Sequence, residues 1–276
     1  MSRRHFSLGI AGVIALAGTV FAAAPAQASA VGVEITQVTT APVVAGKKVE
    51  FSGTAPKSLK GGFVSLVRLG KKSASVGHAI VERDGTFSVK GAPAGVGTNR
   101  FVVKVTLGNK TVTSNTVATT VYSWFSVTGL QQPKTGDGYS VPGGYGRGWL
   151  KDPGLKINGK TYATSFERSG DYYGTANTFV LEGACLTFRG YLGVDDSDTT
   201  HETWTFTLGT SDDNQNFSVV DLGTATNRQD GALVTQDLGG AWYLGLGMTT
   251  DINTTSGSGG AIGNPQVLCS ANPYNF

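Results

Sequence analysis

Two stretches of this sequence decide the fold, Ile157-Asn158-Gly159-Lys160-Thr161-Tyr162 and Tyr191-Leu192-Gly193-Val194-Asp195-Asp196. In the first, Asn158-Gly159 predicts a two-residue β-hairpin turn, because both central positions of that turn need a positive φ. The second closes a run from Cys185 to Val194 in which apolar and polar residues alternate. Such alternation predicts a long, half-buried strand that the acidic pair ends.

The composition predicts an all-β chain around these stretches. Its 276 residues include 40 glycines, and only 15% are charged. Helical periodicity is almost absent, whereas short alternating runs recur along the chain. The length suits two domains behind a leader, and we expect them at residues 31–121 and 122–276.

Residues 1–30 have the pattern of a signal peptide. A charged start, Ser2-Arg3-Arg4-His5-Phe6, precedes an apolar stretch and small residues around Ala28 that suit cleavage. Ser-Arg-Arg-x-Phe also resembles the twin-arginine export signal, and a general secretory signal fits equally well. A membrane anchor is the alternative, but no other stretch approaches the roughly 20 apolar residues of a spanning helix. We therefore expect a secreted, extracellular protein without a transmembrane anchor in its mature form.

Residues 31–121 predict an immunoglobulin-like β-sandwich. About seven short runs, the last from Thr111 to Val121, are separated by turn signals such as Asp84-Gly85. There is no Cys-Trp-Cys pattern, so this half resembles the disulfide-free Ig-like domains of bacteria. His78 lies in one of the runs without an acidic or cysteine partner nearby, which favours a structural histidine over a catalytic one.

Charge divides the two halves. Residues 31–121 carry twelve Lys or Arg against four Asp or Glu, a net charge of about +8, and residues 122–276 carry eight against fifteen, about −7. One interpretation is that the halves attract each other and dock. The other is that the basic half holds an anionic wall polymer or acidic polysaccharide. Nucleic acid is not expected, because this half has few aromatic residues on which bases could stack.

Residues 122–276 predict a jelly-roll sandwich of about eight or nine antiparallel strands, among them Lys160 to Phe166. The two cysteines, Cys185 and Cys269, predict one disulfide in an oxidising compartment, since neither a nearby histidine pair nor a Cys-x-x-Cys pattern supports a metal or redox site. Trp204 alternates with apolar residues and is expected in the core. Trp242 has the same parity as its apolar neighbours, which favours the core over a ligand platform.

The two opening stretches, with their spacing, resemble the NPCBM/NEW2 family of carbohydrate-binding modules over roughly residues 122–269. The resemblance implies a galactose-binding-like β-sandwich that binds a sugar. The chain departs from the family at Ala163-Thr164-Ser165-Phe166-Glu167, where members usually have Gly-x-Gly-Thr-His-Ala. It departs again at Gly259 to Pro265, where members usually have an Asp-His-Ala-Asp-Trp type of segment. Both segments flank the expected ligand-binding end.

Aromatic residues in Gly-rich loops are the candidate sugar platforms. Sugar rings pack on aromatic faces, and their hydroxyls need Asp, Asn, Gln or Arg side chains in the same concavity. We expect a weak neutral-sugar site in the loops of residues 131–153, 167–177 and 249–264. The candidate ligand-binding residues are Trp149, Arg168, Asp171, Tyr172, Tyr173, Asp251, Asn253 and Asn264.

Asp195, Asp196 and Asp198 form an acidic cluster at the end of the predicted strand. Hard cations such as Ca²⁺ take six to eight oxygen ligands, so the cluster suggests a structural calcium site. The alternative is a turn in which these carboxylates accept hydrogen bonds from backbone N–H groups.

The sequence contains no pattern typical of a hydrolase or a metalloprotease. It has no Gly-x-Ser-x-Gly, no His-Glu-x-x-His and no Cys/His pairing, and His201 is the only histidine after residue 121. We therefore expect a monomeric, non-catalytic protein that recognises a glycan or a cell-surface polysaccharide. An extracellular structural or protein-interaction module attached to the cell wall is the main alternative. A glycosidase, which needs two facing carboxylates, is the third.

Overall fold

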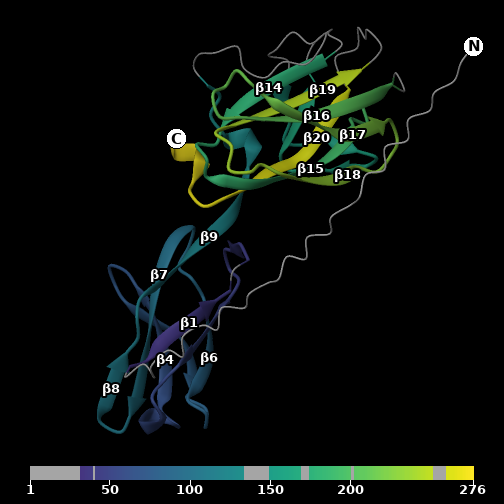
Figure 1. Ribbon diagram of the computed structural model, residues 1–276. Helices are drawn as coiled ribbons and strands as arrows, with labels where there is room; N and C mark the ends of the chain where they lie inside the picture. Colours follow the sequence, from purple (N-terminus) through teal and green to yellow (C-terminus); the bar gives the residue numbers. More distant parts are fainter. Residues whose placement is uncertain (1–31, 40, 134–148, 169–173, 200–201, 251–258) are drawn as a thin grey trace, which may run out of the picture.

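The computed structural model describes residues 32–39, 41–133, 149–168, 174–199, 202–250 and 259–276. Within these residues the chain is almost entirely β, with short 3-10 turns at Lys57–Leu59, Val127–Gly129 and Pro273–Asn275. No helix in the described part is long and apolar enough to cross a membrane. Figure 1 shows the strands gathered into two units, joined where β9 (Val117–Ser126) passes from one to the other. The predicted leader lies outside the described residues.

The first unit consists of two sheets that enclose one core. One sheet has the order β1-β3-β6, and the other contains β5, β4, β7 and β9 with short β2 and β8 at its edges. Phe51 and Phe101 are fully buried between the sheets, with ring centroids 4.8 Å apart. The remaining strands of this unit are β1 (Glu34–Val38), β2 (Val43–Val44), β3 (Val49–Thr54), β4 (Phe63–Leu69), β5 (Ala74–Ile80), β6 (Thr86–Gly91), β7 (Gly97–Leu107) and β8 (Lys110–Thr113).

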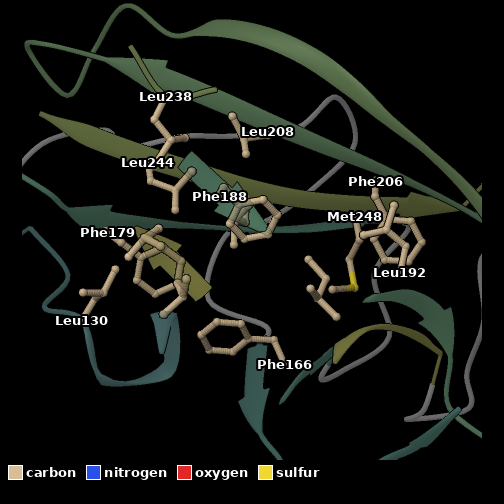
Figure 2. Packing of buried hydrophobic residues seen from close by; sticks show 14 of the residues in the cluster. Leu130, Phe166, Phe179, Phe188, Leu192, Phe206, Leu208, Leu238, Leu244 and Met248 are labelled. Carbon is tan, nitrogen blue, oxygen red and sulfur yellow. The ribbon is translucent and has the colours of Figure 1, made fainter. Parts of the chain in front are cut away.

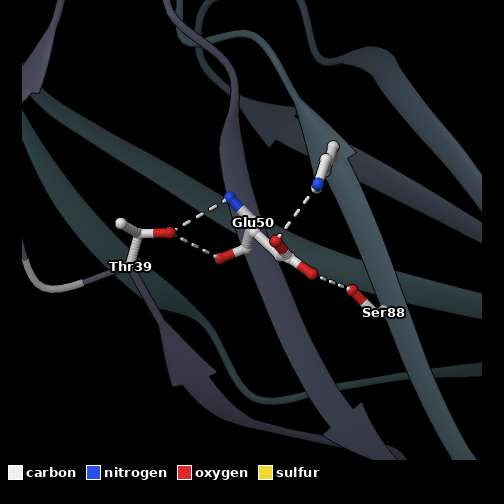
Figure 3. A network of polar contacts seen from close by, with 4 residues as sticks. Thr39, Glu50 and Ser88 are labelled. Atoms are coloured by element: carbon white, nitrogen blue, oxygen red, sulfur yellow. Dashed lines mark hydrogen bonds and ion pairs between the residues drawn. The ribbon is translucent and has the colours of Figure 1, made fainter.

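Glu50 on β3 organises a polar network on the outer face of this sandwich (Figure 3). Its carboxylate accepts a hydrogen bond of 2.6 Å from Ser88 Oγ and lies 3.3 Å from Lys90 Nζ, while Thr39 bonds its backbone. The Ser88 hydrogen bond and the Lys90 charge lower the pKa of Glu50. An alternating strand thus places polar residues outward where they satisfy one another.

The second unit is a sandwich of two sheets. The first contains β10, β13, β20, β15 and β18, and the second has the order β14-β19-β16-β17. The strands of this unit are β10 (Trp149–Lys151), β11 (Lys156–Ile157), β12 (Lys160–Thr161), β13 (Ser165–Arg168), β14 (Gly174–Val180), β15 (Cys185–Val194), β16 (Thr203–Ser211), β17 (Ser218–Thr226), β18 (Ala232–Asp237), β19 (Tyr243–Thr250) and β20 (Gly260–Cys269).

An apolar core lies between these two sheets (Figure 2). Phe166, Phe188 and Leu192 extend from one sheet, and Phe179, Phe206 and Leu244 from the other. The ring of Trp204 is fully buried there, as predicted. Cys185 and Cys269 face each other across β15 and β20 and form the predicted disulfide, which links positions 84 residues apart. The all-β class and the sandwich of the second unit are therefore confirmed.

Strand β9 belongs to both units. Its first half, Val117 to Val121, pairs with β7, and its second half, Ser123 to Ser126, pairs with β20. The predicted boundary at residue 121 thus falls inside one continuous strand. Within the second unit, the Tyr274 hydroxyl donates to the Ser126 carbonyl at 3.0 Å and holds the end of β9 in place. An uninterrupted hydrogen-bonded strand makes the connection between the units stiff.

The stretches of residues 157–162 and 191–196 fold against each other. Asn158 and Gly159 have φ values of 47° and 78° and form the predicted hairpin turn between β11 and β12. The hairpin lies on the outer face of the β13–β20–β15 sheet, where Ile157 packs over Gly193. A Cβ atom at Gly193 would lie 2.4 Å from Ile157, so the close approach requires glycine there. Tyr162 lies over Gly263 in the same way.

Two predicted strands are broken in the structure. The run Thr111 to Val121 divides into β8 and β9 because Ser114 and Asn115 leave the ladder: the Asn115 side chain bonds the backbone of Ile35 instead. The run Lys160 to Phe166 divides into β12 and β13, since the chain turns at Thr164, whose backbone carbonyl accepts from Asn264. In both places side-chain and backbone bonds to distant strands replace the local ladder.

The prediction that Trp242 lies in the core is wrong, because its side chain is 49% exposed. Strand β19 begins only at Tyr243, and Trp242 lies in the turn after Gly239 and Gly240, both of which have positive φ. Its carbonyl accepts hydrogen bonds from the N–H groups of Leu181 and Glu182. Alternation along a strand therefore does not extend to this position.

Candidate functional site

Parts of all three loops expected to form the sugar site lie at one end of the second sandwich, although the first loop begins at the other end, where its Gln131 carbonyl accepts from the Val180 N–H. Trp149 pairs with Arg168 at the start of β10 and the end of β13, and Gly174 pairs with Thr249 at the start of β14 and the end of β19. The two sheets meet at this end, where Trp204 lies against Gly259 and Gly260. We call this the loop end. The two strand pairings bring segments that are distant in sequence to this end.

Most of the predicted sugar-binding residues lie outside the described residues. This applies to Asp171, Tyr172, Tyr173, Asp251 and Asn253. Arg168 is the last residue of β13, but its side chain is outside the description. Their role stays a prediction.

Trp149 differs from its predicted setting in a Gly-rich loop. It begins strand β10, is half-buried, and packs edge-on against Phe166 with the ring centroids 4.9 Å apart. Its indole Nε1 is buried without a hydrogen-bond partner in the described part of the chain. Trp149 therefore contributes to the apolar floor beneath the loop end and is not an open platform. The sequence could not show this, because a three-residue strand has too little alternation to be recognised.

Asn264 lies away from Trp149, in the middle of β20 on the outer face of the sheet. It has a φ of 45°, and its side-chain Oδ1 accepts from the backbone N and the hydroxyl of Thr164, at 3.2 and 3.4 Å. The structure thus separates Asn264 from the other predicted ligand residues that it describes.

A polar pocket of about 400 Å³ lies at the tip of the Asn158-Gly159 hairpin, which we call the hairpin pocket. The end of β15 and the turn after β17 complete it, so it lies at the loop end. Its lining residues are Asn158, Gly159, Asp196, Asp198, Thr199, Asn227 and Arg228. The stretches of residues 157–162 and 191–196, which pack together through Ile157 and Gly193, therefore also meet in this pocket.

Hydrogen bonds fix the walls of the hairpin pocket. The Gly159 N–H donates to Asp196 Oδ2 at 2.7 Å, and the Asp196 N–H donates to the Lys156 carbonyl at 2.9 Å. Asn158 Nδ2 donates to Asp230 Oδ1 at 2.8 Å, and Asn227 Nδ2 donates to the Asp198 carbonyl. Because each of these partners can only accept, the amide orientation of both asparagines is determined. Their carbonyl oxygens stay available, as does the guanidinium of exposed Arg228.

The predicted calcium ligands have partners within the protein. Asp196 holds the hairpin N–H, Asp195 accepts from the Ser197 hydroxyl, and the Asp198 N–H donates to the Asp195 carbonyl. Among the described residues no group of three or more His, Cys, Asp or Glu is arranged to hold a metal ion. Of these contacts, the one made by Asp196 is of the kind that the alternative describes, a carboxylate that accepts from a backbone N–H. A calcium ion at Asp195, Asp196 and Asp198 stays a prediction.

Glu167, near the end of β13, is the carboxyl group at the loop end with the most altered acidity. It is 9% exposed, and burial, reinforced by Asp195 and then Asp152, raises its pKa to about 7. It does not belong to the residues that line the hairpin pocket. The raised pKa of Glu167 was not predictable from the sequence, because the carboxyl groups that act on it, Asp195 and Asp152, follow the distant strands β15 and β10.

Sequence reasoning also missed Asn158, Thr199, Asn227 and Arg228 as pocket residues. The sequence predicts Asn158 only as a turn former, although this residue also lines a pocket. Arg228 has a φ of 62°, a conformation unusual for arginine. A polar Asn-Arg pair between two alternating runs is the only sequence signal, and it is typical of any surface turn.

Carbohydrate-binding modules are among the solved structures similar to this chain. The CBM51-2 and INT domains of Clostridium perfringens ZmpB in complex with GlcNAc are 13% identical with a TM-score of 0.40, and cover 63% of this chain and 38% of that one. CBM51 from Clostridium perfringens GH95 in complex with methyl-galactose is 19% identical with a TM-score of 0.38, covering 52% and 99%. The tandem CBM51 modules of Sp3GH98 from Streptococcus pneumoniae are 11% identical with a TM-score of 0.38, covering 82% of both.

These likenesses concern only the β-sandwich architecture. This chain spans 38% of the length of the ZmpB fragment. No protein-family profile and no curated protein matches the chain. The resemblance to NPCBM/NEW2 and the Ig-like assignment of the first unit are therefore not confirmed.

Proposed function

We propose that the second unit is a non-catalytic carbohydrate-binding module of a secreted protein, related to NPCBM/NEW2 modules, which binds a neutral glycan at the loop end. The hairpin pocket carries this proposal. Its available groups include acceptors, such as the carbonyl oxygens of Asn158 and Asn227, and donors, such as Arg228 and the Thr199 hydroxyl. A sugar hydroxyl both donates and accepts, so a mixed set of this kind suits it.

The size and position of the pocket support the same function. Its volume of about 400 Å³ is within the range of roughly 300–1,000 Å³ typical of small-molecule sites. It also opens at the end where the candidate residues Tyr172, Tyr173 and Asp251 are attached to the sandwich. Tyr172 and Tyr173 stay the aromatic platforms that the sequence predicts for a sugar ring.

The pocket is less suited to glycoside hydrolysis. That reaction needs two facing carboxyl groups, one of them with a raised pKa. Two carboxyl groups line the pocket, but Asp196 accepts from the Gly159 N–H and Asp198 is only 2% exposed. Glu167, whose pKa is raised, lies outside the pocket lining. Binding without catalysis is therefore the function that the geometry supports best.

A protein partner is the second candidate, and the first unit favours it. Phe63 on β4 and Ile80 on β5 lie opposite each other and are 51% and 58% exposed. Paired exposed apolar residues at a sheet edge can dock on another protein. Such docking is compatible with sugar binding by the second unit.

Calorimetry of the full chain with galactosides, N-acetylglucosamine, glucans and mannans tests the proposal. We expect a dissociation constant of about 10 μM to 1 mM, because one or two sugar rings desolvate little surface. Arg228→Gly should weaken binding about tenfold without loss of stability, since glycine suits the left-handed backbone. Tyr172→Ala should weaken it similarly, by about 1–3 kcal/mol.

Glu182→Gly is the matched control, because Glu182 is an exposed charged residue with a φ of 48° at the opposite end of the sandwich. It should bind as the parent does. No heat with any neutral sugar at millimolar concentration would refute the lectin function and favour the protein partner.

A further inference from the structure

A second pocket, of about 240 Å³, lies on the outer face of the β20–β15–β18 sheet, in the middle of the strands. Its lining residues are Arg189, Tyr191, Leu233, Asn264 and Gln266. We call it the sheet-face pocket. Arg189 is opposite Gln266 on β20, and Tyr191 is opposite Leu233 on β18, so these side chains project from the same face. The hairpin flanks the pocket on one side and β9 on the other.

The amide oxygens in this pocket are already used. Gln266 Oε1 accepts from Arg189 Nε at 2.9 Å and from Arg189 Nη2 at 2.7 Å. Asn264 Oδ1 accepts from the backbone N and the hydroxyl of Thr164. All these partners except the hydroxyl can only donate, which determines the orientation of both amides. Each oxygen has two lone pairs, and both are occupied. What Asn264 and Gln266 still offer to a ligand is their N–H₂ donors.

Arg189 adds further donors and a positive charge. Its guanidinium stacks on the Trp124 ring, with Cζ 3.9 Å from the centroid, and its Nε edge is held by Gln266. The edge formed by Nη1 and Nη2 is left with two parallel N–H groups, the geometry that matches a carboxylate. In the described part of the chain the one ion pair is Lys90–Glu50, so Arg189 has no acidic partner there.

A second cation lies beside the pocket. Lys160 Nζ is 4.5 Å from the centre of the Tyr191 ring, and that ring is part of the pocket wall. Contact with an aromatic face holds the ammonium in place without neutralising it. Two cations and two amide N–H₂ groups therefore surround a site whose available hydrogen-bonding groups, apart from the Tyr191 hydroxyl, are donors.

We propose that the sheet-face pocket binds the carboxylate of an acidic sugar, such as a uronate unit of a polysaccharide. A ligand here must supply acceptors and negative charge, and a neutral sugar hydroxyl would leave the Arg189 charge unpaired. The hairpin pocket, with its mixed donors and acceptors, has the opposite preference. The inference rests on different residues from the proposed neutral-glycan site and does not depend on it.

The test is calorimetry of the full chain with an oligogalacturonate, its methyl ester and glycerol phosphate at one fixed ionic strength. The acid should bind, and the methyl ester, which lacks the charge, should bind at least tenfold more weakly. Gln266→Glu should weaken binding of the acid by tenfold or more, because the new carboxylate pairs with Arg189 while keeping the shape of the side chain. Arg189→Gln should have a similar effect.

Lys151→Gln is the control, since it removes the same charge from an exposed position of the second unit outside the sheet-face pocket. It should change the affinity by less than twofold. Equal binding of acid and methyl ester would overturn the proposal, as would a folded Gln266→Glu variant with parental affinity. Tighter binding of glycerol phosphate than of the uronate would overturn the assignment of a carboxylate.

Discussion

Glu167 links the chemistry of the loop end to the stability of the second unit. Burial raises its pKa to about 7, and Asp195 and Asp152 add repulsion. Since the pKa in the folded state exceeds the unfolded value of about 4.3, the folded state retains a proton that the unfolded state loses between about pH 4.5 and 7. The free energy of unfolding should therefore fall as the pH rises through this window, by up to about 3 kcal/mol.

Urea unfolding between pH 4.5 and 8, followed by tryptophan fluorescence, measures this dependence. All four tryptophans, Trp124, Trp149, Trp204 and Trp242, belong to residues 122–276, so the signal reports the second unit. Glu167→Gln should remove most of the decrease, and Glu182→Gln, at an exposed glutamate, should leave it in place. An unchanged decrease in Glu167→Gln would show that another group titrates.

Single residues were predictable where a long strand dictated their side. Trp204, Cys185 and Cys269 belong to strands of nine or ten residues, and each lies as expected. Trp149 begins a three-residue strand and Trp242 precedes the first residue of β19, and alternation gives no information at either position. Their environment depends on which distant strand covers them.

At the scale of elements, the docked hairpin depends on glycines in the strand beneath it. Gly193→Ala should destabilise the second unit by about 1–3 kcal/mol, because the added Cβ would lie 2.4 Å from Ile157 Cγ2. Combining it with Ile157→Ala, which removes the opposing atoms, should cost less than the sum of the two single changes. Urea unfolding of the four proteins measures the coupling.

Gly95→Ala is the control for this cycle. Position 95 has no atom within 4 Å of an added Cβ, so the substitution should be nearly neutral. Strict additivity of Gly193→Ala and Ile157→Ala would contradict the packing that we describe.

The hairpin turn was predictable, but its location on the sheet was not. Asn158-Gly159 defines a local backbone conformation, and both residues adopt it. The packing of Ile157 on Gly193 joins residues 36 positions apart and depends on the register of β15 with β20. The breaks at Ser114 and Thr164 have the same origin, because partners distant in sequence compete with the local ladder.

At the scale of the whole molecule, the shared strand β9 fixes a basic unit to an acidic one. Residues 31–121 carry a net charge of about +8. If this unit attaches the protein to an anionic polymer, retention on a carboxylated polysaccharide should decrease as salt rises from 0.1 to 1 M, because the screening length falls from about 10 to 3 Å. Lys71→Glu/Lys72→Glu should lower retention at 0.1 M.

The matched control, Lys151→Glu/Lys156→Glu, makes the same change in exposed residues of the second unit. It should lower retention less. Equal effects of the two variants, or retention that salt does not change, would limit the basic charge to solubility or to contact between the units.

The scaffold of the second unit was predictable because alternation and turn residues report strands directly. The hairpin pocket was not predictable, since the described segments that line it are short and polar and form a pocket only when the fold brings them together. Asn227 and Arg228 line the same pocket as Asn158 and Asp196 because the fold brings the end of β17 next to the hairpin. Loop composition instead predicts a site at aromatic residues such as Tyr172.

The proposed function depends on the binding of a neutral glycan at the hairpin pocket. An amide NMR titration of the full chain with the best neutral sugar from the calorimetry panel tests it most directly. Binding at the hairpin pocket should shift the amide resonances of Gly159, Thr199 and Arg228 and leave that of Gln266 in the sheet-face pocket unchanged. Saturable shifts confined to the first unit or to the sheet-face pocket, or no shifts at millimolar sugar, would contradict it.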